Sequence, residues 1–230
     1  MNSSVLHVVV VGDSQVGKTS TLLNLRERYS KTLMPLSRSE CIPSVLDAFE
    51  INYLPNNNNN STNGSSTPSP VCMDFFDKIL FIDTPSDDDQ SLYRKEHFYK
   101  EGQVFVIMFA LDRISSFEKV HDYYLEIKEA VITNVTMILV GCKCDLTDRR
   151  EVTLFEGLEL QRKIGAKVYL EISNVSGKNL NSLIDNCVKL GSKLLMQSPN
   201  SPSSQLSDRS QRELINESRP KILQIVKCQQ

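Results

Sequence analysis

One stretch near the N-terminus constrains the fold of this chain more than any other: VVVVGDSQVGKTS, residues 8–20. An unbroken run of valines is typical of a strand that is buried on both faces, because its side chains point to both sides of a sheet. The run ends in a loop bounded by Gly12 and Gly17, and the residues TLLNLRERY that follow have a helical pattern. The stretch therefore predicts a strand, a tight loop and a helix in direct succession.

The loop has the phosphate-loop pattern Gly12-x-x-x-x-Gly17-Lys18-Thr19, in the strand-to-helix context which that motif requires. Its glycines let the backbone turn tightly, so that successive N–H groups face one anion, and the N-terminal end of the helix adds positive potential. We expect the Lys18 ammonium to reach the β- and γ-phosphates of a nucleotide and the Thr19 hydroxyl to ligate Mg²⁺. A glycine-rich turn with a solvated lysine is the alternative. The predicted nucleotide-binding residues here are Gly12, Asp13, Ser14, Gln15, Val16, Gly17, Lys18, Thr19 and Ser20.

Apolar runs of strand length alternate with helical patterns along the rest of the chain. The predicted strands are 5–11, 49–54, 75–82, 104–111, 135–141 and 167–172. Apolar residues recur at spacings of three and four in the helical regions 117–131 and 180–194. This alternation predicts an α/β fold in which helices cover both faces of a mainly parallel, six-stranded sheet.

Two segments are too polar to join this core. NNNNNSTNGSSTPSP (56–70) lies between two predicted strands and cannot bury enough apolar surface to offset its ordering entropy. A Ser/Pro-rich segment begins at residue 197. We therefore predict one domain over residues 1–196, with a low-complexity loop insertion at about 55–71, and a flexible tail over residues 197–230.

Charge and cysteine content narrow the class of protein. The net charge of −2 does not favour nucleic acid or acidic membranes as partners. The six cysteines are scattered without a pairing pattern, which is typical of a reduced, intracellular chain. Cys142 and Cys144 lack a second cysteine pair or a nearby histidine, so we expect no zinc site.

Beyond the phosphate loop, the sequence resembles the small GTPases of the Ras superfamily over residues 5 to about 195. The segments that carry the resemblance, in the family's order and approximate spacing, are GDSQVGKT, FIDTP, VFVIMFALD, SSFEKV and LVGCKCDL. The resemblance implies a P-loop NTPase fold that binds GTP and GDP with Mg²⁺.

The segment CKCD (142–145) stands where the family has Asn-Lys-x-Asp. Asp145 matches the acid, and a carboxylate can accept hydrogen bonds from guanine N1–H and N2–H₂, which adenine does not offer. Lys143 matches the lysine whose stem covers the base and the sugar. Cys142 replaces the asparagine that ties this loop to the phosphate loop and contacts the base, which implies weaker guanine affinity. The alternative role of Asp145 is a helix N-cap.

The family's second base loop, Thr-Ser-Ala-Lys, appears here as ISNV (172–175). Ser173 matches, and Asn174 keeps the backbone N–H that the family offers to the base at that position. Val175 lacks the lysine's amine. Tyr29, near the end of the first predicted helix, is either the aromatic residue beside the base or a core residue.

Both switch segments depart from the family. Ser44 takes the place of the first switch's threonine and, with Thr19 and Asp83, completes the predicted Mg²⁺ ligands, although Ser44 could also be a surface turn residue after Pro43. In the second switch the glycine is Ser86 and the catalytic glutamine is Asp87. Because a carboxylate at that position repels the γ-phosphate, we expect very slow intrinsic hydrolysis and no confident catalytic residue.

No arginine finger is assigned. We expect three arginines to be solvated surface charge: Arg94, Arg149 and Arg150.

These features predict a Ras-like GTP/GDP-binding switch in intracellular signal transduction. The family implies an effector facing residues 44–51, an exchange factor and a GTPase-activating protein. A pseudo-GTPase that acts as a binding or scaffold module without turnover is the competing interpretation, and an unrelated ATP-dependent phosphate-loop enzyme is the third. Because Cys228 is third from the last residue of this sequence, we expect no C-a-a-X prenylation signal. We expect a cytoplasmic location, with weak or no contact at the cytoplasmic face of a membrane.

Overall fold

The valine run forms strand β1 (Val5–Gly12) in the computed structural model of the chain, which describes residues 5–30, 49–51, 76, 78–86, 88–131 and 135–197. The predicted insertion at 55–71 and the tail beyond residue 197 lie outside these ranges. The chain divides into two units, residues 1–192 and 193–230, and the sheet belongs to the first. The proposed division into a domain and a tail at residue 196 stays a prediction.

The described strands form one six-stranded sheet in the order β2-β3-β1-β4-β5-β6. Only β2 runs antiparallel to its neighbour, β3. The other strands are β2 (Phe49–Ile51), β3 (Lys78–Asp83), β4 (Val104–Ala110), β5 (Thr136–Cys142) and β6 (Val168–Glu171). The predicted α/β class and mainly parallel sheet are confirmed.

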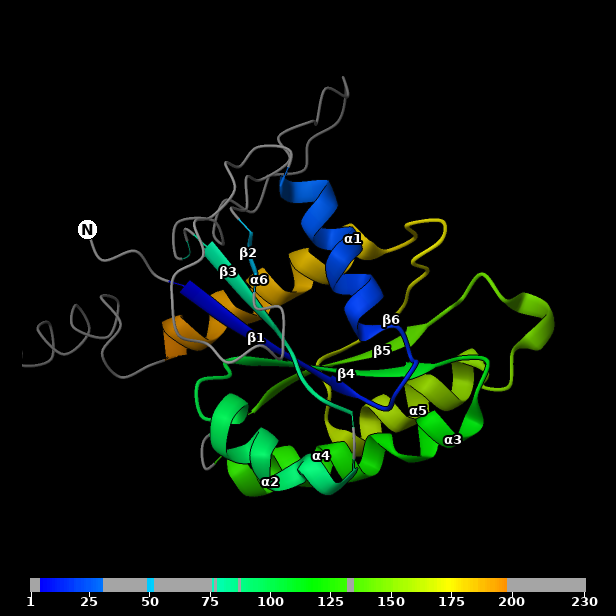
Figure 1. Ribbon diagram of the computed structural model, residues 1–230, viewed down its shortest axis with the longest axis horizontal. Helices are drawn as coiled ribbons and strands as arrows, with labels where there is room; N and C mark the ends of the chain where they lie inside the picture. The colour runs from blue at the N-terminus through cyan, green and yellow to red at the C-terminus, as the bar shows by residue number, and fades with distance from the viewer. Residues whose placement is uncertain are drawn as a thin grey trace, which may run out of the picture. The chain divides into compact units, whose positions relative to one another are not determined.

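Helices lie on both faces of the sheet, as Figure 1 shows. One face carries α1 (Lys18–Ser30) and residues 180–192 of α6 (Leu180–Gln197). The other face carries α2 (Ser91–Arg94), α3 (Ile114–Glu118), α4 (Val120–Ala130) and α5 (Leu154–Ile164). Short 3₁₀ turns at Asp88–Gln90 and Thr147–Arg149 and a π-helical turn at Lys95–Tyr99 complete the described elements.

The sheet separates two apolar cores, and β1 contributes to both. Leu6 and Val8 pack in the cluster that includes α1 and α6, whereas Val9 and Val11 pack in the cluster that includes α4 and α5. The residues of β4 and β5 alternate between the two clusters in the same way. Burial of both faces explains why these strands are continuous apolar runs rather than alternating patterns.

The carboxyl ends of the parallel strands meet at one edge of the sheet, because parallel neighbours share a direction. Gly12 ends β1, Asp83 ends β3 and Cys142 ends β5. The loops that leave these ends therefore gather side chains that are far apart in the sequence, and ligands of open α/β sheets bind at this edge.

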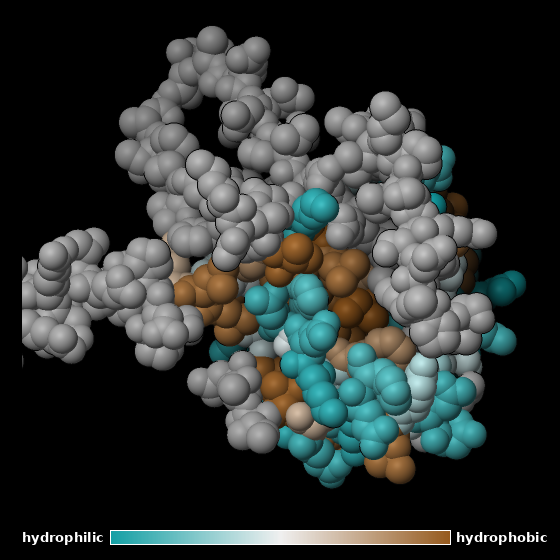
Figure 2. All heavy atoms as spheres, turned by 60° about the vertical axis from the view of Figure 1, so that its left-hand side comes forward, coloured by the Kyte–Doolittle hydropathy of each residue, from teal (hydrophilic) through white to brown (hydrophobic). Residues whose placement is uncertain are grey.

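Hydrophobic and hydrophilic residues are mixed on the surface. Figure 2 shows one face of the molecule, on which brown hydrophobic residues lie beside teal hydrophilic ones. The most exposed large apolar side chains of the described part include Leu92, Phe155 and Val175, and scattered exposure of this kind is normal. None of the described helices has both the length and the apolar character that crossing a bilayer requires.

Gly12 gives a direct test of this packing. It lies opposite Met108 in β4, and a Cβ added to it would be 2.2 Å from the Met108 carbonyl oxygen. We expect Gly12→Ala to lower the free energy of unfolding by about 3 kcal/mol, because a backbone atom cannot rotate away from the clash.

Urea denaturation measures the loss in Gly12→Ala, and Gly165→Ala is the matched control in the same experiment. Gly165 also has a positive φ, of 68°, but a Cβ there meets nothing within 4 Å. Strain in φ alone costs about 1 kcal/mol, so equal losses for the two variants would contradict the close approach of β1 and β4.

Candidate functional site

The phosphate loop occupies the turn between β1 and α1. Gly12 has a φ of 149° and Gly17 a φ of 108°, and Gln15 between them also has a positive φ, of 58°. Backbone turns of this kind let successive N–H groups converge on an anion. Val16 is buried under the loop, whereas Ser14 and Gln15 are exposed. The predicted strand–loop–helix unit is thus present.

Lys18 lies at the centre of this loop and is only 6% exposed. Its ammonium donates to the carbonyl oxygens of Gly12, at 2.7 Å, and Asp13, at 3.0 Å, and to the hydroxyl of Ser86. Burial lowers the pKa of Lys18, and the carboxylates of Asp83 and Asp13 act against that shift. Lys18 is therefore not the solvated lysine that the alternative interpretation predicts.

A cavity of about 350 Å³ opens over the loop. It is lined by most of the predicted phosphate-loop residues from 14 to 20, including Lys18, and by residues 83–86. The structure therefore brings the phosphate loop and the start of the second switch segment together around one space.

Two of the three predicted Mg²⁺ ligands meet at this cavity. The Thr19 hydroxyl donates to Asp83 Oδ2 at 2.5 Å. A hydroxyl beside a carboxylate is a hard oxygen pair of the kind that Mg²⁺ uses together with phosphate oxygens and water. The described residues thus fit the ion in chemistry. Ser44, the third predicted ligand, and Asp87, at the catalytic position, lie outside the described residues.

The two base loops lie side by side at the ends of β5 and β6. The backbone N–H of Cys144 donates to the Ile172 carbonyl oxygen at 3.1 Å. Lys143 adopts a φ of 64°, and its ammonium forms an ion pair with Asp112 at 3.0 Å. Asp145 is exposed beside them. The following 3₁₀ turn begins after Leu146 without a side-chain cap, so the N-cap alternative for Asp145 has no hydrogen bond to support it.

Cys142 and Ser173 are the buried residues of these loops. Cys142 packs in the apolar cluster with α1 and α6, and burial raises the pKa of its thiol to about 12. The Ser173 hydroxyl accepts hydrogen bonds from the backbone N–H groups of Val175, at 3.2 Å, and Ser176, at 3.1 Å. Ser173 therefore shapes the turn of the second base loop.

Asn174 is placed as predicted in that loop, but its side chain has a role that the sequence did not reveal. The carboxamide contacts the phosphate loop: its Nδ2 donates to the Gly17 carbonyl oxygen at 3.3 Å. The family has alanine at this position, which indicates a role for the backbone only.

Tyr29 is a core residue rather than the aromatic residue beside the base. Its ring packs against the cluster with α1 and α6, and its hydroxyl lies 3.4 Å from Asn181 Oδ1, at the start of α6. Burial raises the pKa of this hydroxyl. The residue is therefore engaged near the far end of α1, away from the phosphate loop.

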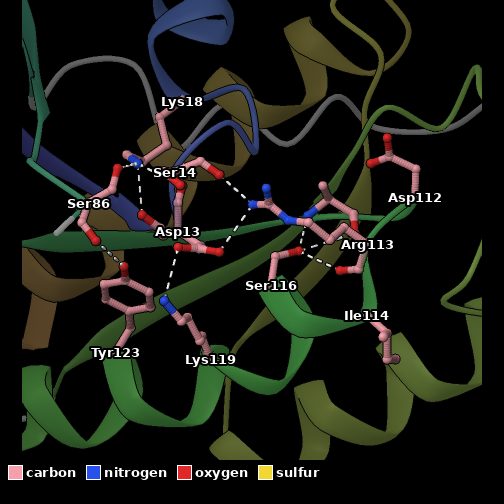
Figure 3. Close-up of polar contacts among 12 residues, drawn as sticks. Asp13, Ser14, Lys18, Ser86, Asp112, Arg113, Ile114, Ser116, Lys119 and Tyr123 are labelled. Carbon is pink, nitrogen blue, oxygen red and sulfur yellow. Dashed lines mark hydrogen bonds and ion pairs between the residues drawn. The ribbon is translucent and has the colours of Figure 1, made fainter. Parts of the chain in front are cut away.

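A cationic pair that sequence reasoning missed holds the outer side of the phosphate loop (Figure 3). The Asp13 carboxylate accepts from Arg113, at 3.1 Å, and from Lys119, at 3.3 Å. Arg113 also donates to the Ser14 carbonyl oxygen. The partners are about a hundred residues away in sequence, so no local spacing could have indicated them. This pairing directs the negative charge of Asp13 toward the start of α3 and α4.

The expectation that Arg94 is solvated was wrong. The side chain is only 2% exposed and forms a bidentate ion pair with Glu126, with distances of 2.8 and 2.7 Å. Tyr99 donates to the same carboxylate at 2.6 Å. Burial disfavours the charge on Glu126, but the hydrogen bonds from Arg94 and Tyr99 outweigh it and lower the pKa of Glu126. The partner lies on α4, which sequence reasoning could not know.

This buried pair also anchors the second switch segment. Arg94 donates to the Pro85 carbonyl oxygen at 3.1 Å, and Tyr123 of α4 donates to the Ser86 carbonyl oxygen at 3.1 Å.

Arg150 also has a partner, Glu171 at 3.0 Å, which corrects the expectation that Arg150 is solvated. Arg149 is exposed, as predicted.

We expect Glu126→Leu to lower the free energy of unfolding by about 3 kcal/mol, because it leaves a guanidinium buried without its carboxylate. Urea denaturation measures the loss. Glu129→Leu is the matched control on the same helix, since Glu129 pairs with Lys95 at 2.8 Å at the surface, and its loss should be below about 1 kcal/mol. Similar losses for the two variants would contradict the buried character of the Arg94 pair.

Comparisons with known proteins identify the family of the chain. The model of the Ras family matches residues 77–192, just over half of the chain. The Rho-related protein racN of Dictyostelium discoideum is 28% identical over 200 residues, which cover 83% of this chain and 78% of that protein. The phosphate loop precedes the family match and supports it independently. The chain therefore belongs to the Ras family of small GTPases.

Proposed function

We propose that the chain is a GTP/GDP-binding switch of signal transduction that hydrolyses GTP slowly when it acts alone. The observation that carries this proposal is the buried Lys18 ammonium, which main-chain carbonyls of the phosphate loop hold beside a cavity of nucleotide-binding residues. A buried cation at the start of a helix attracts polyphosphate strongly, because little water screens its charge.

Guanine recognition is assigned to Asp145 in this proposal. The side chain is exposed at the end of the sheet where the base loops meet, and its carboxylate can accept from both donors of guanine. Lys143 would cover the base and the sugar, with its ammonium held at Asp112. Ser173 and Asn174 form the opposing turn.

Mg²⁺ would be held by Thr19 and Asp83, with Ser44 as the proposed third ligand. When bound, the ion neutralises phosphate charge that develops as the terminal phosphate leaves. The chain's own contribution is to hold Thr19 and Asp83 within hydrogen-bonding distance of each other at the cavity.

Slow hydrolysis follows from the groups around the terminal phosphate. No arginine is present among the described residues that line the cavity, and Arg94 is engaged with Glu126. Asp87 stands where the family has the catalytic glutamine, and its carboxylate would repel the γ-phosphate. We therefore propose that a GTPase-activating protein supplies the missing catalytic group, and that exchange factors and effectors act in the family's manner, the effectors at residues 44–51.

Cytoplasmic residence, with weak or no membrane contact, belongs to the same proposal. The described cysteines Cys142, Cys144 and Cys187 are free thiols, which suits a reducing compartment.

A scaffold without turnover is the second candidate, and a specific observation favours it. The Lys18 ammonium already has protein partners, including the Ser86 hydroxyl, where the family has glycine. Cys142 and the exposed Val175 also depart from the family's base-binding residues. The nucleotide content of the purified protein distinguishes the two candidates.

We expect denatured wild-type protein to release nearly one guanine nucleotide for each protein molecule. Lys18→Ala should release at least about tenfold less, because the buried cation is lost. Chromatography of the released nucleotide measures both. Lys167→Ala, at an exposed lysine outside the site, is the control and should retain full occupancy.

An empty wild-type protein would favour the scaffold, and recovered ATP or ADP would favour an ATP-dependent enzyme. Where GTP is bound, single-turnover release of phosphate decides between a slow GTPase and a protein without turnover.

Asp145→Asn should shift preference from guanine to xanthine nucleotides, because an amide can donate to the carbonyl that xanthine carries at C2. We expect guanine affinity to fall by at least about tenfold, or ~1.4 kcal/mol, in competition with a fluorescent GDP analogue. Asp148→Asn, at an exposed acid three residues away, is the control. Unchanged guanine affinity in Asp145→Asn would remove Asp145 as the base reader.

A further inference from the structure

The chain lacks the asparagine that ties the first base loop to the phosphate loop in relatives, and the residue in its place cannot form that tie. Cys142 is 0% exposed in an apolar cluster, and its thiol stays protonated because burial raises its pKa. A thiol is a weak donor and a weak acceptor. A substitution of this kind would leave the two loops without their usual polar connection.

Asn174 makes a polar connection from the other base loop. Its Nδ2 donates to the Gly17 carbonyl oxygen at 3.3 Å, and its Oδ1 accepts from the Thr21 hydroxyl at 3.0 Å. The Thr21 hydroxyl also lies 2.9 Å from the Gly17 carbonyl oxygen, and the Thr21 backbone N–H donates to that oxygen at 2.9 Å. Gly17, Thr21 and Asn174 therefore form one small hydrogen-bonded cluster at the first turn of α1.

The backbone of Asn174 is attached to the same helix. Its carbonyl oxygen accepts from Asn24 Nδ2 at 3.2 Å, one turn further along α1. Both the side chain and the main chain of Asn174 thus hold the second base loop to the helix that carries Lys18 and Thr19.

The cluster is partly shielded from water and closely packed. Thr21 is 0% exposed, whereas Gly17 and Asn174 are half-buried, so solvent competes only in part with these hydrogen bonds. A Cβ placed on Gly17 would lie 3.1 Å from Asn174 Nδ2, which shows how directly the carboxamide abuts the phosphate loop. Ser173 holds the remaining turn of the base loop through the N–H groups of Val175 and Ser176.

We propose that Asn174 is a positioning residue that fixes the second base loop to the phosphate loop, and so supplies from β6 the tie that Cys142 cannot supply from β5. The proposal rests on the proposed nucleotide-binding function. Because the two loops bind opposite ends of one nucleotide, a rigid connection lets each contact strengthen the other. Its loss should shorten the time for which a nucleotide stays bound.

The test compares Asn174→Ala with the wild type in two measurements. In the first, release of a fluorescent GDP analogue in the presence of Mg²⁺ should be at least about tenfold faster in Asn174→Ala. In the second, hydrogen exchange of the backbone amides of residues 18–22 is measured in nucleotide-free protein, and it should also be faster in the variant.

Two further variants separate positioning from a general loss of stability. Asn181→Ala removes an exposed asparagine that contacts Tyr29 at the far end of α1, and neither measurement should change. Cys142→Asn, introduced into Asn174→Ala, restores the family's residue and should recover slow release at least in part.

Unchanged release in Asn174→Ala, an equal effect of Asn181→Ala, or no recovery on addition of Cys142→Asn would each overturn the proposal. Wild-type protein that binds no guanine nucleotide would refute the proposed function instead. Hydrogen exchange then decides on the connection alone: faster exchange in Asn174→Ala supports it, and unchanged exchange overturns it.

Discussion

The structure depends on one constraint: a lysine ammonium must be held in a nearly buried position at the edge of a parallel sheet. The carbonyl oxygens of Gly12 and Asp13 accept from Lys18, so the loop curves around the side chain. That curvature requires a φ of 149° at Gly12, where a Cβ would collide with the backbone of β4. The buried valine strand before the loop and the helix after it hold this geometry in place, and the predicted Mg²⁺ ligands Thr19 and Asp83 meet beside it.

Several charged side chains near the phosphate loop and the base loops are paired within the protein. Asp13 is paired with Arg113 and Lys119, and Lys143 with Asp112. The buried pair of Arg94 and Glu126 fixes the segment that ends at Ser86. Because an uncompensated charge near a site of low dielectric would act strongly on a bound anion, these pairs leave Lys18 and the backbone of the loop as the groups to which we assign the attraction for phosphate.

The departures from the family fall at positions where the family contacts the base and the reacting phosphate, whereas the sheet and the phosphate loop are retained. Cys142 and Asn174 illustrate the difference. The first loses a polar side chain and joins the apolar core, whereas the second gains one and directs it to Gly17. A position-by-position comparison of the sequence with the family's motifs gives only two separate substitutions, at positions 142 and 174. In the structure, Asn174 contacts the phosphate loop from the second base loop, whereas Cys142 is buried at the end of β5, where the first base loop begins.

Short stretches of the chain are sufficient to predict the strands, from continuous apolar runs, and the phosphate loop, from glycines and a lysine at fixed spacing. Local backbone sterics and burial on both faces of a sheet govern these features. The partners of Arg94, Asp13 and Asn174 could be found only from the folded chain, because they lie 32, 100 and 157 residues away in the sequence. Such pairs form because strand order brings distant loops to one edge, and their energy depends on burial, which no local pattern of residues specifies.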